Sequence, residues 1–322
     1  MKKLIVEPSP HIRSSNSTAQ IMRGVIIAAI PTAAGAVYIF GPRAALLIVT
    51  CICSCVFFEF FFRFLCKKPS TIHDLSAVVT GLLLAFNLPV TFPLYMAVIG
   101  SFAAIVVAKE MFGGLGANFA NPAIVGRIVL MLSFPAYMSN YVVPFYYRKG
   151  VDAVTAATPL AARSVEEAPS TFKLLLGTHG GTLGETCAAA LILGFFLLWM
   201  MKIVRPITPF AFVGTVAAGT YIAGGDPLTA VLSGGLLLGA IFMATDYATN
   251  PMTPLGKFVF GIGCGVITVV IRQFGTMPEG VAFSILTMNM LTPMIDKLSR
   301  PKPFGVVRKK GGKEKVDEQN KT

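Results

Sequence analysis

The chain has 322 residues, of which 54% are hydrophobic and 13% are charged. Soluble globular proteins carry about 25% charged residues, so this composition excludes an ordinary soluble domain. The net charge of +12 resembles that of nucleic-acid-binding proteins. Lys and Arg cluster between and after apolar stretches, however, which is typical of the cytoplasmic loops of membrane proteins and does not indicate a nucleic-acid site. We therefore predict an all-α, polytopic integral membrane protein.

Ten apolar stretches follow one another along the chain. Most approach the length of about 20 residues that an α-helix needs to cross a membrane. They lie at 20–40, 43–64, 75–91, 93–112, 121–136, 183–203, 207–224, 227–245, 256–274 and 279–296. The third, fifth and eighth stretches are short or interrupted by Gly and Pro, which predicts broken or tilted helices at these places.

The distribution of positive charge predicts the orientation. If the N-terminus is cytoplasmic, 19 of the 27 Lys and Arg residues fall in cytoplasmic segments and six fall outside. This bias favours a multi-pass cell-membrane protein with both termini in the cytoplasm, and the N-terminal segment lacks the pattern of a signal peptide. The predicted parts are a cytoplasmic segment at 1–19, membrane helices at 20–136, an extracytoplasmic loop at 137–182, membrane helices at 183–299 and a basic cytoplasmic tail at 300–322. The lysines of the tail favour contact with anionic membrane lipid.

A weak internal repeat relates the two membrane parts. The run from Thr80 to Leu84 resembles the run from Ser233 to Leu238, and Phe112-Gly113 resembles Phe274-Gly275. Two copies of five helices each have opposite orientations, and such inverted repeats place ligand sites at their interface. The pattern alone fits a small-solute channel or a secondary transporter as well as a redox protein.

Three cysteines fall within one apolar stretch. At helical spacing Cys51 and Cys55 share a face, while Cys53 points elsewhere. We interpret them as small apolar packing residues, and a thiolate site shared between subunits is the alternative. The sequence contains no CxxC pair, so the usual spacing of iron–sulfur and zinc ligands is absent.

Several charged residues lie within or beside the apolar stretches. Glu59 and Arg63 are four residues apart, so one helical face holds both, and we favour a structural role for them. Asp246 follows a Gly-rich stretch, and a site role and a structural role are equally compatible with its position. Charge at membrane depth indicates function by default, but no residue is assigned as an ion ligand from the sequence.

The segment from Gly113 to Asn121 is rich in glycine. Gly113 and Gly114 permit positive φ angles, and Asn118 or Asn121 is placed to cap the next helix, with Pro122 in its first turn. Irregular backbone at membrane depth occurs where it is buried in protein or lines a cavity. The segment is therefore either a tight reversal between helices or the wall of a ligand site.

The predicted outer loop carries the most informative motif, from Asp152 to Thr158. The residues alone are compatible with a simple turn that ends at Pro159. They also present the Thr158 hydroxyl among small side chains, which a bulky group can approach closely. The pattern Asp-x-x-Ser/Thr-x-Ala-Thr resembles the flavinylation motif of bacterial membrane redox complexes, with Thr155 at its Ser/Thr position.

Further motifs extend this resemblance from about residue 8 to residue 304. They are Ser9-Pro10-His11, the run from Gly113 to Ala123, Met243-Ala244-Thr245-Asp246, Asn250-Pro251-Met252-Thr253-Pro254 and the run from Pro278 to Phe283. The sequence resembles the family that contains the D subunit of the Rnf complex (RnfD) and the B subunit of the quinone-reducing sodium pump (NqrB). The short polar N-terminus favours the Rnf branch.

The resemblance implies a subunit of an ion-translocating complex that moves electrons between reduced ferredoxin and NAD. It implies that a flavin transferase joins FMN to Thr158 through a phosphoester, with Asp152 and Thr155 as parts of the motif. A second, noncovalent flavin such as riboflavin is known in relatives. Candidates for the wall of its site are Gly113, Gly114, Asn118 and Asn121. The expected partners are the other Rnf subunits, above all the extracytoplasmic flavin-bearing G subunit. The flavin would supply the redox chemistry, so no catalytic side chains are predicted and no activity is expected from this chain alone.

Overall fold

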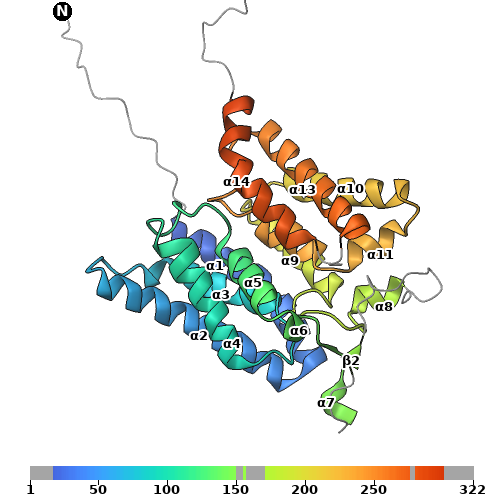
Figure 1. The fold of residues 1–322 in the computed structure, drawn as a ribbon, viewed down its shortest axis with the longest axis horizontal. Coiled ribbons are helices and arrows are strands. Elements are labelled where there is room, and N and C mark those ends of the chain that lie inside the picture. Colours follow the sequence, from blue (N-terminus) through green and yellow to red (C-terminus); the bar gives the residue numbers. More distant parts are fainter. Residues whose placement is uncertain (1–16, 150–154, 157–170, 276–279, 301–322) are drawn as a thin grey trace, which may run out of the picture.

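The computed structural model describes residues 17–149, 155–156, 171–275 and 280–300 (Figure 1). The first half contains α1 (Thr18–Phe40), α2 (Pro42–Leu65), the 3-10 helix η1 (Ile72–Asp74), α3 (Ser76–Phe86), α4 (Leu94–Phe102), the π-helix η2 (Ala103–Glu110), α5 (Pro122–Ser133) and α6 (Pro135–Met138). The connection contains β1 (Tyr141–Val142), α7 (Tyr146–Lys149), β2 (Thr155–Ala156) and α8 (Thr171–Leu176). The second half contains α9 (Ala188–Met200), α10 (Ile207–Ile222), α11 (Pro227–Leu232), α12 (Leu236–Leu238), the π-helix η5 (Gly239–Met243), α13 (Pro254–Phe274) and α14 (Val281–Ser299).

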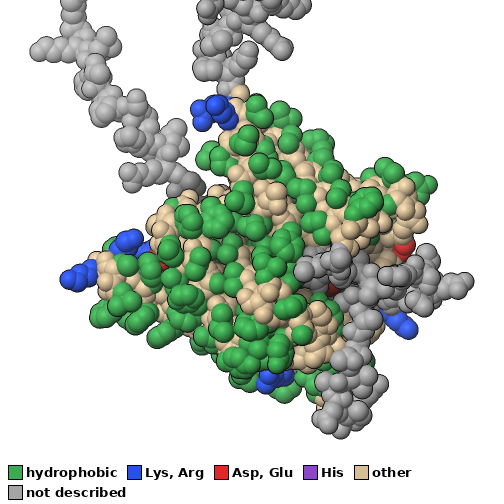
Figure 2. All heavy atoms as spheres, in the orientation of Figure 1, with side chains coloured by type: hydrophobic (Ala, Val, Ile, Leu, Met, Phe, Trp, Pro, Cys, Tyr) green, Lys and Arg blue, Asp and Glu red, His purple; other side chains and the backbone are tan. Residues whose placement is uncertain are grey.

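The predicted all-α membrane class is confirmed. Each of the ten apolar stretches contains at least one of these helices, while the exact number of membrane spans and the division into domains stay predictions. Three helices, α1, α2 and α13, are long and apolar enough to cross a membrane, and α3, α5, α9 and α10 are shorter apolar helices. Hydrophobic side chains cover most of the face in Figure 2, and Lys and Arg gather at its margins. This distribution suits a protein whose flanks contact lipid.

Local sequence signals fix several helix ends. The Ser17 hydroxyl accepts the Gln20 N–H while the Gln20 side chain accepts the Ser17 N–H, which forms a capping box at α1. Asn121 caps α5 and Pro122 is its first residue, so this choice between the two predicted caps is settled for Asn121. These caps satisfy N–H groups that would otherwise be unpaired at the helix start.

The eighth stretch is broken, as predicted. Asp226 caps α11, which ends at Leu232. Gly234 and Gly235 then adopt left-handed conformations with φ of 70° and 66°, and the helix restarts at Leu236. Left-handed backbone strains any residue with a Cβ, so the glycine pair lets the helix break here with little conformational strain.

The two halves pack on each other through equivalent helices. The first helices of the halves, α1 and α9, are in contact, and so are the last, α5 and α14 (Figure 1). Gly194 permits close approach, because a Cβ there would lie 2.6 Å from the Ala28 carbonyl oxygen. Such pairing is compatible with two related halves, and the inverted repeat stays a prediction.

A short antiparallel hairpin, β1–β2, marks one end of the molecule, which we call the hairpin end. Tyr141 pairs with Ala156 and Val142 pairs with Thr155. The opposite end, where α1 begins and α2 ends, is called the pocket end. In α2, Cys51 and Cys55 are buried and Cys53 is exposed, as the helical spacing predicts. Both buried thiols lie among apolar core residues, which supports a packing role.

Candidate functional site

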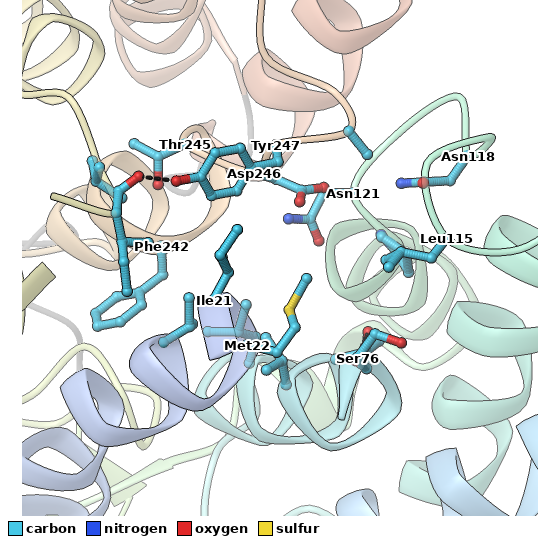
Figure 3. Close-up of a pocket in the computed structure, with 18 of the residues that line it drawn as sticks. Ile21, Met22, Ser76, Leu115, Asn118, Asn121, Phe242, Thr245, Asp246 and Tyr247 are labelled. Carbon is cyan, nitrogen blue, oxygen red and sulfur yellow. Dashed lines mark hydrogen bonds between the residues drawn. The ribbon is translucent and has the colours of Figure 1, made fainter. Parts of the chain in front are cut away.

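A pocket lies between the two halves at the pocket end and encloses about 740 Å³, counting the space at its mouth. The first turn of α1 and the start of α3 form one wall, and the ends of α9 and η5 form another. In Figure 3, Leu115 and Asn118 lie on one side of the pocket, and Phe242 and Thr245 lie on the opposite side.

Two asparagines of the Gly113–Asn121 segment line the pocket. The Asn118 side chain shapes its own loop, because its Oδ1 accepts the Gly116 N–H at 3.3 Å and its Nδ2 donates to the Ala120 carbonyl at 3.0 Å. Asn121 joins the two halves. Its Oδ1 accepts the Ala123 N–H at 3.0 Å, and its Nδ2 donates to the Met243 carbonyl at the end of η5, at 3.3 Å.

The first two glycines of this segment form a reversal between helices, which is one of the two predicted alternatives. Gly113 and Gly114 do not belong to the pocket lining. Both have positive φ, 119° and 96°, and they turn the chain after η2. A Cβ at Gly114 would lie 2.5 Å from Arg63 Nη2, so this glycine leaves space for a buried guanidinium.

Lys109 brings a cation to the edge of the pocket. Its Nζ lies 2.7 Å from Oε2 of Glu59 and 2.8 Å from Oγ of Ser76. The other Glu59 oxygen, Oε1, accepts the Thr71 hydroxyl at 2.5 Å. Lys109 is 2% exposed and Glu59 is fully buried. A buried pair of this kind is tolerated only because further hydrogen bonds satisfy both groups.

The expected role of Glu59 and Arg63 is structural, and their burial on one face of α2 agrees with it. Their ionic partners, however, are on η2 rather than each other. Arg63 Nε lies 3.0 Å from Glu110 Oε2, and Arg63 Nη1 also donates to the Pro69 carbonyl at 3.0 Å. Lys109 and Glu110, which are consecutive in η2, thus bind Glu59 and Arg63, which lie one turn apart on α2. Spacing along the sequence does not predict these two contacts.

Asp246 also lines the pocket, directly after η5. Its side chain accepts the Thr249 hydroxyl at 3.4 Å, and its carbonyl accepts the Asn250 N–H at 3.0 Å. Figure 3 shows Asp246 beside Asn121, so the acidic side chain and the amide come together from different halves. The prediction left a site role for Asp246 open, and its position favours that role.

The flavinylation motif is described only in part. Thr155 forms β2 with Ala156 and pairs with Val142. Asp152 and Thr158 lie outside the described residues. The hairpin therefore brings the motif's Thr155 to β1, directly after α6, at the end of the molecule opposite the pocket.

Sequence reasoning missed the pocket roles of Ser76, Thr80 and Lys109. The signal was present in part, because each of these polar residues stands in or beside an apolar stretch. Burial of a polar group at membrane depth requires a partner or a ligand. Which groups meet was decided by packing between segments that are distant in sequence.

Comparison with known proteins identifies the family of the chain. The model of the NQR2, RnfD, RnfE family matches residues 5–305. The chain belongs to this family. The family match covers both halves, the pocket and the hairpin.

Relatives within the family are similar over nearly their whole length. The D subunit of the Na+-translocating ferredoxin:NAD+ oxidoreductase complex of Acetobacterium woodii is 45% identical, over 95% of this chain and 96% of that protein. The D subunit of the proton-translocating ferredoxin:NAD+ oxidoreductase complex of Clostridium ljungdahlii is 42% identical, over 94% and 96%. The D subunit of the ion-translocating oxidoreductase complex of Stutzerimonas stutzeri is 35% identical, over 90% and 93%.

Proposed function

We propose that this chain is the membrane-embedded D subunit of an ion-translocating ferredoxin:NAD+ oxidoreductase complex and that it carries electrons through bound flavin. The observation that supports this role is the full-length similarity to the D subunits of such complexes. The other subunits of the complex are its partners, including a flavin-bearing protein outside the membrane. A stand-alone channel or transporter is the weaker alternative, because the family members compared above are named as subunits of oxidoreductase complexes.

We assign the noncovalent flavin to the pocket between the halves because of the chemistry of its lining. A flavin ring system has an apolar dimethylbenzene edge and an edge of carbonyl and N–H groups. The pocket offers apolar side chains from α1 and α9 on one part of its wall, and amides and hydroxyls on another, including Asn118, Asn121, Ser76 and Thr80. A pocket that is mainly apolar with a few placed polar groups fixes the orientation of such a ligand.

Within this site the residues of the chain have separate tasks. Asn118 and Asn121 would hydrogen-bond the polar edge of the ring, since each amide Nδ2 carries two N–H donors. Lys109 donates to Glu59 and to Ser76, and its ammonium group has a third N–H donor that a ligand at the pocket edge can accept. The bound flavin would supply one- and two-electron redox chemistry, while the protein supplies binding, orientation and electrostatics.

A second flavin, FMN, is proposed on Thr158 through a phosphoester. The motif from Asp152 to Thr158 supports this assignment, and only a hydroxyl side chain at position 158 can form the linkage. The hairpin that pairs Thr155 with Val142 would then hold the covalent flavin at the end opposite the pocket. Two flavins at opposite ends suit electron transfer across the protein.

Two reciprocal variants test these assignments in the complex, expressed with a flavin transferase. Covalent flavin is measured as fluorescence of the denatured band, and noncovalent flavin as flavin released by acid. Thr158→Ala is expected to abolish the fluorescent band and to retain released flavin. Asn118→Leu is expected to lower released flavin and to retain the band. A fluorescent Thr158→Ala band would place the covalent site elsewhere, and unchanged release from Asn118→Leu would exclude the pocket.

A further inference from the structure

Polar residues connect the pocket with the hairpin end through an otherwise apolar core. We call this connection the seam and define it by Asn121, Asn87, Arg127, Glu185 and Gly234. Asn121 donates to the Met243 carbonyl, and Asn87 Nδ2 lies 3.7 Å from the Met243 sulfur. Arg127 Nη1 donates to Asn87 Oδ1. Leu83, Phe86 and Phe242 pack in the core around these groups.

Arg127 sits where the two halves meet. It belongs to α5, and a Cβ at Gly235 in the second half would lie 3.7 Å from its Nη1. Arg127 is 3% exposed and Asn87 is 1% exposed. A permanently charged guanidinium is thus fixed in the seam, beside the glycine break that interrupts the eighth stretch.

A second arginine and one carboxylate complete the charge at this break. Glu185 Oε1 accepts the Gly234 N–H, and its Oε2 accepts the Thr182 hydroxyl at 3.3 Å. Arg272 of α13 donates to the Ala230 carbonyl at 2.7 Å and to the Gly234 carbonyl at 3.2 Å. Glu185 interacts electrostatically with both arginines. Two guanidinium groups and one carboxylate are therefore gathered around the break.

Several acceptor oxygens at the break already accept hydrogen bonds from the protein. The Asn87 amide oxygen accepts from Arg127, the Gly234 carbonyl accepts from Arg272, and the Glu185 carboxylate accepts from backbone and hydroxyl donors. Na+ needs such oxygens in place of its hydration shell, and H+ needs acceptors that can pass it on. At this point of the seam a cation therefore meets the positive charge of the Arg127 and Arg272 guanidinium groups.

We infer that Arg127 is a fixed positive barrier, which stops Na+ and H+ from passing between the two halves from the pocket to the hairpin end. Arginine in a pore excludes cations by the same electrostatic principle. The benefit of the barrier rests on the proposed function, because a leak would dissipate the ion gradient that the complex builds. The barrier itself does not depend on any flavin.

The test measures passive ion flux through the complete complex, purified and reconstituted in sealed vesicles without an electron donor. The probes are uptake of radioactive Na+ and the collapse of an imposed pH gradient. Arg127→Gln removes the charge, and Asn87→Asp places a compensating carboxylate beside an intact Arg127. Both are expected to raise passive Na+ or H+ flux at least about tenfold. Arg127→Lys keeps the charge and should stay near the wild-type flux.

Arg148→Gln serves as the matched control. Arg148 is an exposed arginine at the hairpin end, stacked on Tyr38, Phe145 and Tyr147, and its loss should leave passive flux unchanged. Wild-type passive flux through Asn87→Asp complexes with normal subunit content would overturn the barrier. This result decides the question even if Arg127→Gln complexes fail to assemble. Loss of covalent or released flavin with normal passive flux would bear on the proposed function and would leave the barrier unaffected.

Discussion

The ammonium group of Lys109 lies 2.7 Å from the carboxylate of Glu59, with both side chains removed from solvent. The pair links η2 to α2, and the bond from Lys109 to Ser76 connects it to the lining of the pocket. The two residues are 50 positions apart, so the contact also helps to fix how α2 packs against the π-helix η2.

Removal of one partner of this pair should be more harmful than removal of both. Glu59→Gln leaves the Lys109 charge buried without its carboxylate, which costs about 3–5 kcal/mol in comparable cases. The double variant Glu59→Gln/Lys109→Met removes both charges and should recover most of this loss. Thermal unfolding of the detergent-solubilised protein, followed with a thiol-reactive dye at the buried Cys51, Cys55 and Cys264, measures the difference. Equal destabilisation of single and double variants would contradict a paired role.

Asn121 should have separable effects on the α5 cap and on the pocket. Asn121→Ala removes the cap of α5 and is expected to lower stability by about 1 kcal/mol. Asn121→Ser restores a capping oxygen but lacks the Nδ2 donor that binds the Met243 carbonyl. Stability of the Ser variant should approach wild type, while both variants should release less noncovalent flavin on acid treatment. Full flavin release from Asn121→Ser would show that the amide donor is dispensable.

Gly126 should tolerate no side chain. A Cβ there would lie 2.8 Å from the Gly100 carbonyl oxygen and 3.0 Å from Ala104 Cβ, so Gly126→Ala must separate α5 from α4 and η2. Such overpacking costs about 1–3 kcal/mol. Gly214→Ala in α10 is the control, because nothing lies within 4 Å of the added methyl, and helix propensity there favours Ala by about 1 kcal/mol. The unfolding temperature should therefore fall for Gly126→Ala and hold or rise for Gly214→Ala.

Acid should weaken the cap of α11. The Thr229 hydroxyl, together with the Leu228 and Thr229 N–H groups, holds the pKa of Asp226 below its ordinary value. A depressed native pKa gives stability that is present above the ordinary value of about 3.9 and is lost as pH falls through the native pKa. Asp226→Ser keeps a capping oxygen that does not titrate in this range. Unfolding temperatures measured from pH 6 to pH 3 should fall less for the Ser variant, and parallel curves would contradict the assignment.

The sequence by itself determined the class of the protein and several local features. Its low charge and ten apolar stretches predict membrane helices, since burial in lipid demands uninterrupted apolar surface. Asn121-Pro122 predicts a helix start, and the glycines near residue 234 predict a break, because caps and left-handed backbone depend on neighbouring residues only. The motif around Thr158 predicts covalent flavin, which stays a prediction because Thr158 lies outside the described residues.

Tertiary structure alone decided which polar groups meet. The sequence suggested Glu59 and Arg63 as neighbours on one helical face, but packing gave each a partner on η2. It likewise brought Asn121 to Met243 and Arg127 to the glycine break. A buried polar group must find a partner wherever the folded chain supplies one, and in this fold that partner comes from a distant segment. Periodicity along the chain carries no record of such contacts.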